Sequence, residues 1–243
     1  MDNTFKIPTE IVELPSQGLI YPESSPLSSG TIEMKYMTAK EEDILTNQNY
    51  ISKGTVLDEL VKSLIVSDIS YDDLIIGDKN AILIAARILG YGSEYKFNYG
   101  GEEHTVDLTT LDSKPLNKDL FKQGVNEFDF TLPSSKLPIT FKLLTGHDEK
   151  KIDAELAGLK KINKNASPDL STRLKYIITS VNDNRETKDI RQFVDTNLLA
   201  RDSRALREYI REVQPDVDMT FFLDGNDKKI TIPIGLNFFW PDI

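Results

Sequence analysis

Ile32–Leu45 reads IEMKYMTAKEEDIL, and later in the chain Ile139–Ile152 reads ITFKLLTGHDEKKI. In both stretches the side chains alternate up to Met37 or Leu144, as in a β-strand with one buried face. A threonine follows, with an acidic residue three positions later, which is typical of a capped helix N-terminus. Each stretch therefore predicts a strand that runs directly into a capped α-helix.

The likeness extends beyond these two stretches. Leu14-Pro15-Ser16 is echoed by Leu132-Pro133-Ser134, and residues 62–67 match residues 175–180. The matched positions within the quoted stretches are Ile32/Ile139, Lys35/Lys142, Thr38/Thr145 and Glu42/Glu149. Matched without a gap through a later helix and hairpin are Asp78/Asp202, Ala81/Ala205, Arg87/Arg211, Phe97/Phe221, Gly101/Gly225, Val106/Ile230 and Leu108/Ile232. Two α+β segments can share alternation and caps by chance, but one unbroken register favours an internal duplication.

We therefore predict an α+β fold made by tandem duplication, in which each copy has a strand, about three helices and a β-hairpin. The predicted domains are an N-terminal arm (residues 1–30), a first repeat (31–113), a connector (114–127) and a second repeat with an aromatic tail (128–243). Among the helices, Asp78 is the expected N-cap of Lys79–Leu89, and a long helix is expected over Ser167–Val181.

Composition narrows the class of protein. The 243 residues carry a net charge of −10 and no cysteine, which argues against a general phosphate-backbone binder and excludes disulfides and thiolate metal sites. No apolar run reaches the length of about 18 residues that a membrane helix needs, and the N-terminus lacks signal-peptide features. A reducing cytoplasm fits this composition.

The sequence shows no constellation of catalytic or metal-binding residues. His104 and His147 lie at non-equivalent places in the two copies and belong to no zinc motif. Carboxylate pairs fall in expected first turns or loops, where they are usually solvated. Arg201–Arg211 alternates basic with acidic residues, as in an exposed, salt-bridged helix. We therefore expect no catalytic residue, no metal and no cofactor, and we expect that the protein is not an enzyme.

Two apolar segments are the candidates for partner binding. The arm contains Leu19, Ile20 and Tyr21, flanked by prolines and serines. Such an arm is either disordered or binds a neighbour. The second segment contains the consecutive aromatics Phe238, Phe239 and Trp240. If extended, these three cannot all face one core, so at least one is expected on another surface; docking onto the chain's own core is the alternative.

Four stretches resemble a known family: Leu14-Pro15-Ser16-Gln17-Gly18, Met37–Glu42, Ala85–Gly92 and the ending Phe238-Phe239-Trp240-Pro241. They resemble the baseplate hub subunits and hub-assembly proteins of contractile-tailed bacteriophages of the T-even type. Relatives in this family carry Cys-x-x-Cys knuckles at two hairpin turns, which make a zinc ribbon. Here residues 98–101 (NYGG) and 223–226 (LDGN) stand in their place, so the resemblance implies hairpins held by side-chain packing without metal.

The resemblance implies a structural or assembly component of a baseplate hub that acts by protein–protein binding. Its partners would be other phage tail or baseplate hub proteins within a hetero-oligomer, in the virion tail or in the host cytoplasm during assembly. An alternative is a tail-assembly chaperone that shields the tape-measure protein or another hub protein. A hydrolase with an unrecognised site is the least favoured reading, and neither nucleic acid nor membrane is an expected partner.

Overall fold

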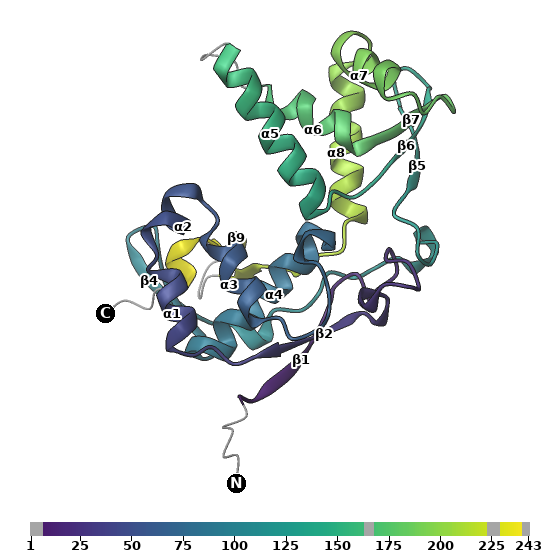
Figure 1. The fold of residues 1–243 in the computed structure, drawn as a ribbon. Coiled ribbons are helices and arrows are strands. Elements are labelled where there is room, and N and C mark those ends of the chain that lie inside the picture. The colour runs from purple at the N-terminus through teal and green to yellow at the C-terminus, as the bar shows by residue number, and fades with distance from the viewer. Residues whose placement is uncertain (1–6, 163–167, 223–228, 240–243) are drawn as a thin grey trace.

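The computed structural model describes residues 7–162, 168–222 and 229–239. In these ranges the chain is a mixed α+β protein with eight α-helices and several small antiparallel sheets, so the predicted class is confirmed. Figure 1 shows two lobes joined by extended segments. Within the described ranges, no helix is both long enough and apolar enough to cross a membrane.

The first lobe begins with a two-stranded sheet. β1 (Thr9–Glu13) pairs with β2 (Thr31–Lys35) in antiparallel register. Its helices and closing hairpin are α1 (Ala39–Leu45), α2 (Gln48–Lys53), α3 (Val56–Leu64), α4 (Ile76–Tyr91), β3 (Glu94–Tyr99) and β4 (Glu102–Asp107). Short 3-10 helices are η1 (Pro26–Ser29), η2 (Tyr71–Asp73), η3 (Leu108–Thr110) and η4 (Lys118–Leu120). α4 buries half of its residues, polar as well as apolar, and is the central helix of this lobe.

The second lobe is a three-stranded sheet with four helices (Figure 1). Its strands, in spatial order, are β5 (Phe128–Thr131), β6 (Pro138–Phe141) and β7 (Ile178–Val181). The helices are α5 (Gly146–Ile162), α6 (Asp169–Ile177), α7 (Thr187–Thr196) and α8 (Ala200–Val213).

The prediction of one long helix over Ser167–Val181 is wrong at its C-terminal end. α6 stops at Ile177, and the next four residues form β7 against β6. β-branched residues favour strands, and here β6 offers a partner: the hydroxyls of Thr179 and Thr140 lie 2.6 Å apart across the pair. The predicted start at Ser167 lies outside the described residues.

Both quoted stretches fold as a strand followed by a capped helix, as predicted. In the first, the carboxylate of Glu41 accepts hydrogen bonds from the backbone N–H and the hydroxyl of Thr38 (3.0 and 2.6 Å), and Lys35 lies 2.8 Å from its other oxygen. In the second, Asp148 accepts the same two bonds from Thr145 (both 3.2 Å). Lys142 completes this arrangement at 2.7 Å from Asp148.

A second contact also occurs in both halves. The backbone N–H of Ser16 donates to Asp78 (2.9 Å), and the N–H of Ser134 donates to Asp202 (2.6 Å). These matched contacts support a duplication, which nevertheless stays a prediction. The sheets differ in strand number, and the described residues of the first lobe form no helix corresponding to α7.

The end of the second predicted repeat does not stay in the second lobe. After α8 the chain returns to the first lobe and forms β8 (Thr220–Phe222), β9 (Lys229–Thr231) and the 3-10 helix η5 (Leu236–Phe239). Phe221 packs edge-on against Phe97 of β3, with ring centroids 5.4 Å apart. The two hairpins therefore meet through aromatic side chains, while the turn at 223–228 lies outside the described residues.

The N-terminal segment is not a separate arm. Residues 9–13 form β1, and the loop that follows is held on the first lobe, with Leu27 fully buried. Proline and glycine interrupt regular structure in this loop but do not prevent packing, because its polar groups find partners within the lobe. The predicted boundary at residue 30 is thus not a domain boundary.

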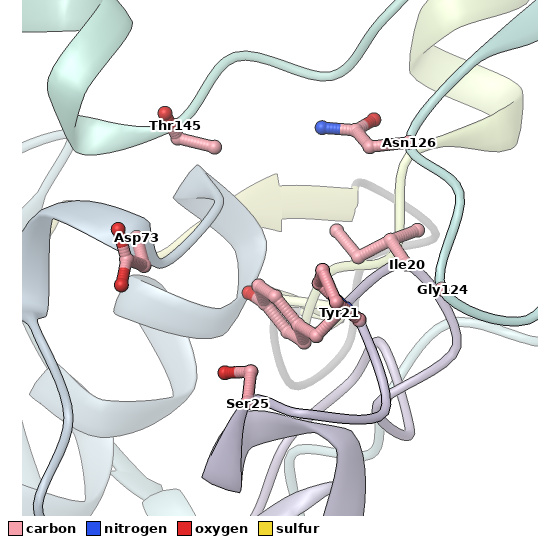
Figure 2. Close-up of a pocket in the computed structure, with 8 residues that line it drawn as sticks. Ile20, Tyr21, Ser25, Asp73, Gly124, Asn126 and Thr145 are labelled. Atoms are coloured by element: carbon pink, nitrogen blue, oxygen red, sulfur yellow. The ribbon is translucent and has the colours of Figure 1, made fainter.

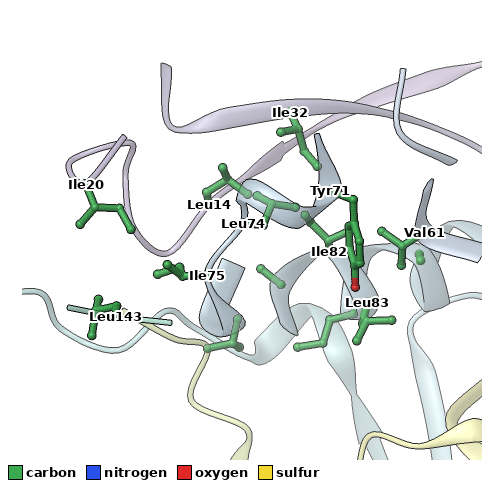
Figure 3. Close-up of a cluster of buried hydrophobic side chains, with 14 of the residues drawn as sticks. Leu14, Ile20, Ile32, Val61, Tyr71, Leu74, Ile75, Ile82, Leu83 and Leu143 are labelled. Carbon is green, nitrogen blue, oxygen red and sulfur yellow. The ribbon is translucent and has the colours of Figure 1, made fainter. Parts of the chain in front are cut away.

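One buried apolar cluster runs through both lobes, and Figure 3 shows part of it. Leu14, Ile32, Leu74 and Ile82 form its part in the first lobe, and all are at most 2% exposed. Leu143, which precedes α5, extends the cluster toward the second lobe. Packing therefore joins the lobes near the start of α5.

Candidate functional site

The candidate site is a cleft between the lobes, with a volume of about 450 Å³ (Figure 2). Four short segments, each from a different part of the chain, form its wall. The lining residues are Ile20, Tyr21, Pro22 and Ser25 from the loop after β1, Asp73 from η2, Gly124 and Asn126 from the segment before β5, and Thr145 at the start of α5. The cleft thus contains two of the residues that the sequence selects for partner binding.

Tyr21 is fixed in the wall by a buried polar network. Its hydroxyl donates to Asp78 (2.6 Å) and accepts the backbone N–H of Ile75 (3.1 Å). The other oxygen of Asp78 accepts the N–H of Ser16. Asp78 was expected to cap its helix, but α4 begins two residues earlier, and the carboxylate in its first turn binds the loop instead.

Burial governs the protonation of both partners in this network. It raises the pKa of Asp78, although the hydrogen bonds from Tyr21 and Ser16 oppose that rise. Burial, followed by the nearby Asp78, also raises the pKa of Tyr21 far above its usual range. The phenol therefore keeps its proton and stays a donor at physiological pH.

The opposite wall is tied to the first lobe by backbone contacts. The N–H of Gly146 donates to the carbonyl of Leu74 (3.1 Å), and Thr145 pairs with Ile75 in an isolated antiparallel bridge. A Cβ atom at Gly146 would lie 2.9 Å from the Cα of Asp72, which is closer than real Cβ contacts come. Glycine is therefore required for this approach of α5 to η2.

Charged side chains reinforce the junction next to the cleft. His147 lies 3.1 Å from Asp73, and Lys150 forms an ion pair with Asp72. Burial alone would raise the pKa of Asp72, but the hydrogen bond and charge of Lys150 outweigh it and hold the pKa below its usual value. The ammonium of Lys79 lies 4.0 Å from the ring centroid of Tyr71, a cation–π distance.

On the far side of the cleft, the segment before β5 is held by reciprocal bonds. Asn126 donates to the carbonyl of Leu143 (2.8 Å) and accepts its N–H (2.9 Å). The N–H of Gly124 donates to the carbonyl of Leu19 (2.8 Å). Hydrogen bonds therefore fix the cleft wall at Tyr21, at Gly124 and Asn126, and at the start of α5.

The structure separates the two predicted partner-binding segments. Leu19 is half-buried beside the cleft, and Ile20 and Tyr21 line it. Phe238 and Phe239 are only 1% exposed: they lie in η5, where Phe238 packs against Tyr95 at 4.8 Å.

The described part of the tail is not extended, and Phe238 and Phe239 follow the alternative of docking onto the chain's own core. A 3-10 helix turns successive side chains by roughly a third of a circle, so two neighbouring aromatics can both reach one core. Trp240 lies outside the described residues. Any role of Phe238 and Phe239 in partner binding stays a prediction and would act through the shape of the surface above them.

Sequence reasoning did not identify Asp73, Asn126 or Thr145 as neighbours of the arm. The sequence match of Asp78 with Asp202 was the one signal that pointed to a buried partner of the arm, because Asp78 is the residue that binds Ser16 and Tyr21. Among the described residues, no three His, Cys, Asp or Glu side chains gather as a metal site would require.

Comparison of this chain with protein-family models, with curated proteins and with solved structures found no match.

Proposed function

We propose that this chain is a structural or assembly component of a contractile-tail baseplate hub that acts by protein–protein binding. The proposal rests on the sequence resemblance to that family and on one structural observation. The four stretches that carry the resemblance are scattered along the sequence, yet all of them meet at α4.

Three contacts make this convergence. Ser16, in the first stretch, binds Asp78 of α4. Met37, in the second, packs on Gly90 so closely that a Cβ at Gly90 would lie 2.8 Å from its Cε. Arg87, in the third, donates from Nε to the carbonyl of Phe238 in the fourth, at 3.0 Å.

Arg87 is the central member of this set. It is 4% exposed, and its guanidinium also donates to the carbonyls of Gly92 (2.9 Å) and Glu94 (3.2 Å). The residues shared with the family thus bind the chain to itself rather than line a reaction centre. This arrangement favours a scaffold that presents a surface, and the fixed cleft beside Tyr21 is the surface we assign to a partner.

The first test concerns the particle. Mass spectrometry of purified virions of a contractile-tailed phage that encodes this chain should detect it if the chain is a hub subunit. Detection only in the infected-cell lysate, bound to another tail protein, would favour the assembly chaperone. Absence of any tail-protein partner in both samples would refute the proposal.

The second test concerns the cleft. Pro22 and Pro26 are both exposed prolines of the same loop, but only Pro22 lines the cleft. Pro22→Arg should reduce capture of the tail-protein partner in a pull-down, whereas Pro26→Arg should not. Equal capture by the two variants, with both folded by circular dichroism, would place the binding surface elsewhere.

A further inference from the structure

A second, smaller pocket lies where α8 leads back to the first lobe. Its volume is about 220 Å³, and it is lined by Lys114, Arg207, Ile210, Arg211, Gln214 and Asp216. Three of these six side chains are cationic and one is anionic. A local excess of positive charge is unexpected in a chain whose net charge is −10.

The frame of this pocket is a short backbone ladder. The N–H of Lys114 donates to the carbonyl of Asp216, and the N–H of Asp218 donates to the carbonyl of Asp112, both at 2.8 Å. Ser113 and Val217 form an isolated antiparallel bridge between these two bonds. Lys114 and Asp216 are therefore held side by side independently of α8.

The single carboxylate of the pocket is already engaged. Asp216 accepts hydrogen bonds from the side-chain amide of Asn80 and from the N–H of Val217, both at 2.9 Å. Lys114 reaches its second oxygen at 3.5 Å. With these donors in place, Asp216 is fixed at the pocket's edge, and its single negative charge is outnumbered by the three cationic side chains that line the pocket.

The arginines keep their donors. Arg207 and Arg211 lie one turn apart on α8. Arg207 donates from Nε to the carbonyl of Ser203 (3.3 Å), and the guanidinium of Arg211 makes no hydrogen bond within the described residues. Four other guanidinium groups of the described chain pair with carboxylates, in Arg173–Glu149, Arg185–Glu127, Arg191–Glu155 and Arg204–Glu208. The expectation of an exposed, salt-bridged helix is met by Arg204 and Glu208, but among the described residues Arg207 and Arg211 form no ion pair within 4 Å.

We propose that this pocket binds a single oxyanion group, a phosphate or a carboxylate. Planar guanidinium groups donate pairs of hydrogen bonds that match both anions, and Lys114 adds a further charge. The pocket's size suits one such group, not an extended ligand. A polyanion such as nucleic acid is disfavoured because Glu208 and Glu212 lie on the same helix and the whole chain is acidic. This inference goes beyond the proposed function and does not depend on it.

The test is a titration of the full-length, ¹⁵N-labelled protein followed through its arginine Nε–Hε signals. Sodium phosphate and sodium acetate are added separately at constant ionic strength. Saturable shifts should appear for Arg207 and Arg211, and Arg207→Gln or Arg211→Gln should each weaken binding about tenfold, which corresponds to about 1.4 kcal/mol. Tighter binding of phosphate identifies a phosphate site, and equal or tighter binding of acetate identifies a carboxylate site.

The matched control is Arg204→Gln. It removes the same charge from the same helix, but Arg204 does not line the pocket and pairs with Glu208 at 2.8 Å. Binding should be unchanged in this variant. A loss as large as that of Arg211→Gln would mean diffuse attraction, and the absence of any saturable shift in the millimolar range would mean no site; either result overturns the proposal. Circular dichroism melting curves confirm that all three variants are folded.

Discussion

Tyr21→Phe tests the network that fixes the cleft wall. The substitution removes one hydroxyl and leaves the ring, so packing is preserved. Two buried partners then lose their bond: the carboxylate of Asp78 loses a donor at 2.6 Å, and the N–H of Ile75 loses its acceptor at 3.1 Å. Ile75 is 1% exposed, so water does not reach that N–H readily.

The expected cost follows from these two losses. A hydrogen bond to a charged group contributes about 1.5–3 kcal/mol, and an unsatisfied buried donor costs about 1–3 kcal/mol. With partial relaxation, we expect Tyr21→Phe to lower the free energy of unfolding by about 3 kcal/mol. Urea unfolding curves, monitored by circular dichroism, measure this loss of free energy. The control is Tyr50→Phe, because the hydroxyl of Tyr50 has no hydrogen bond among the described residues. This substitution should change the free energy of unfolding by no more than about 0.5 kcal/mol.

The pH dependence gives a second readout. The pKa of Asp78 is raised in the folded state. The contribution of Asp78 to the free energy of unfolding is therefore most favourable below the unfolded pKa of about 4, and this advantage is lost as the pH rises through the folded pKa. Removing the Tyr21 donor raises that folded pKa further. The cost of Tyr21→Phe should therefore be smaller at pH 4 than at pH 7. A cost below about 0.5 kcal/mol at pH 7, equal to that of the control, would refute the network.

The remaining predictions concern the junction, an ion pair and the tail. Gly146→Ala should destabilise the protein, because its Cβ meets Asp72, whereas Gly158→Ala in open space of the same helix should stabilise it by about 0.5–1 kcal/mol; thermal melting distinguishes them. The hydrogen bond from Arg185 lowers the pKa of Glu127 to about 2. The stability that Glu127→Gln removes at pH 7 should therefore fade as the pH falls from about 4 towards 2. Urea titrations of both proteins at pH 7 and pH 3 check this, and an unchanged difference in the free energy of unfolding would contradict it. Phe238→Ala should lower the free energy of unfolding by about 3–5 kcal/mol, as for a core aromatic, and a denaturation midpoint like that of wild type would show that η5 does not need this ring.

Local signals in the sequence were sufficient for the parts of the fold that depend on neighbours in the chain. The strand–threonine–helix units follow from alternation and from an acid three residues after the cap, and both form as predicted. The predicted duplication matches Phe97 with Phe221 in sequence, but it does not predict that the two rings are in contact, as they are in the structure.

The errors arose where a distant partner decided the structure. Ile178–Val181 continues a helical pattern, but β6 captures it as a strand. The loop after β1 looks like a free arm because it is rich in proline, serine and glycine, yet Asp78 supplies the buried partner that holds it. Likewise, the cleft combines four segments whose proximity is a property of the tertiary fold, so no spacing in the sequence could reveal Asp73 or Asn126.

The return of the chain to the first lobe has a consequence for synthesis. The hairpin β3–β4 and the guanidinium of Arg87 are made early, but their partners, Phe221 and Phe238, are among the later residues to be translated. The first lobe therefore cannot complete its core on the ribosome while the second lobe is being made. A domain that normally would fold first must wait, with Tyr95 and Phe97 uncovered, until residues 217–239 have emerged. This order leaves part of the apolar core of the first lobe without its covering residues until synthesis is nearly complete.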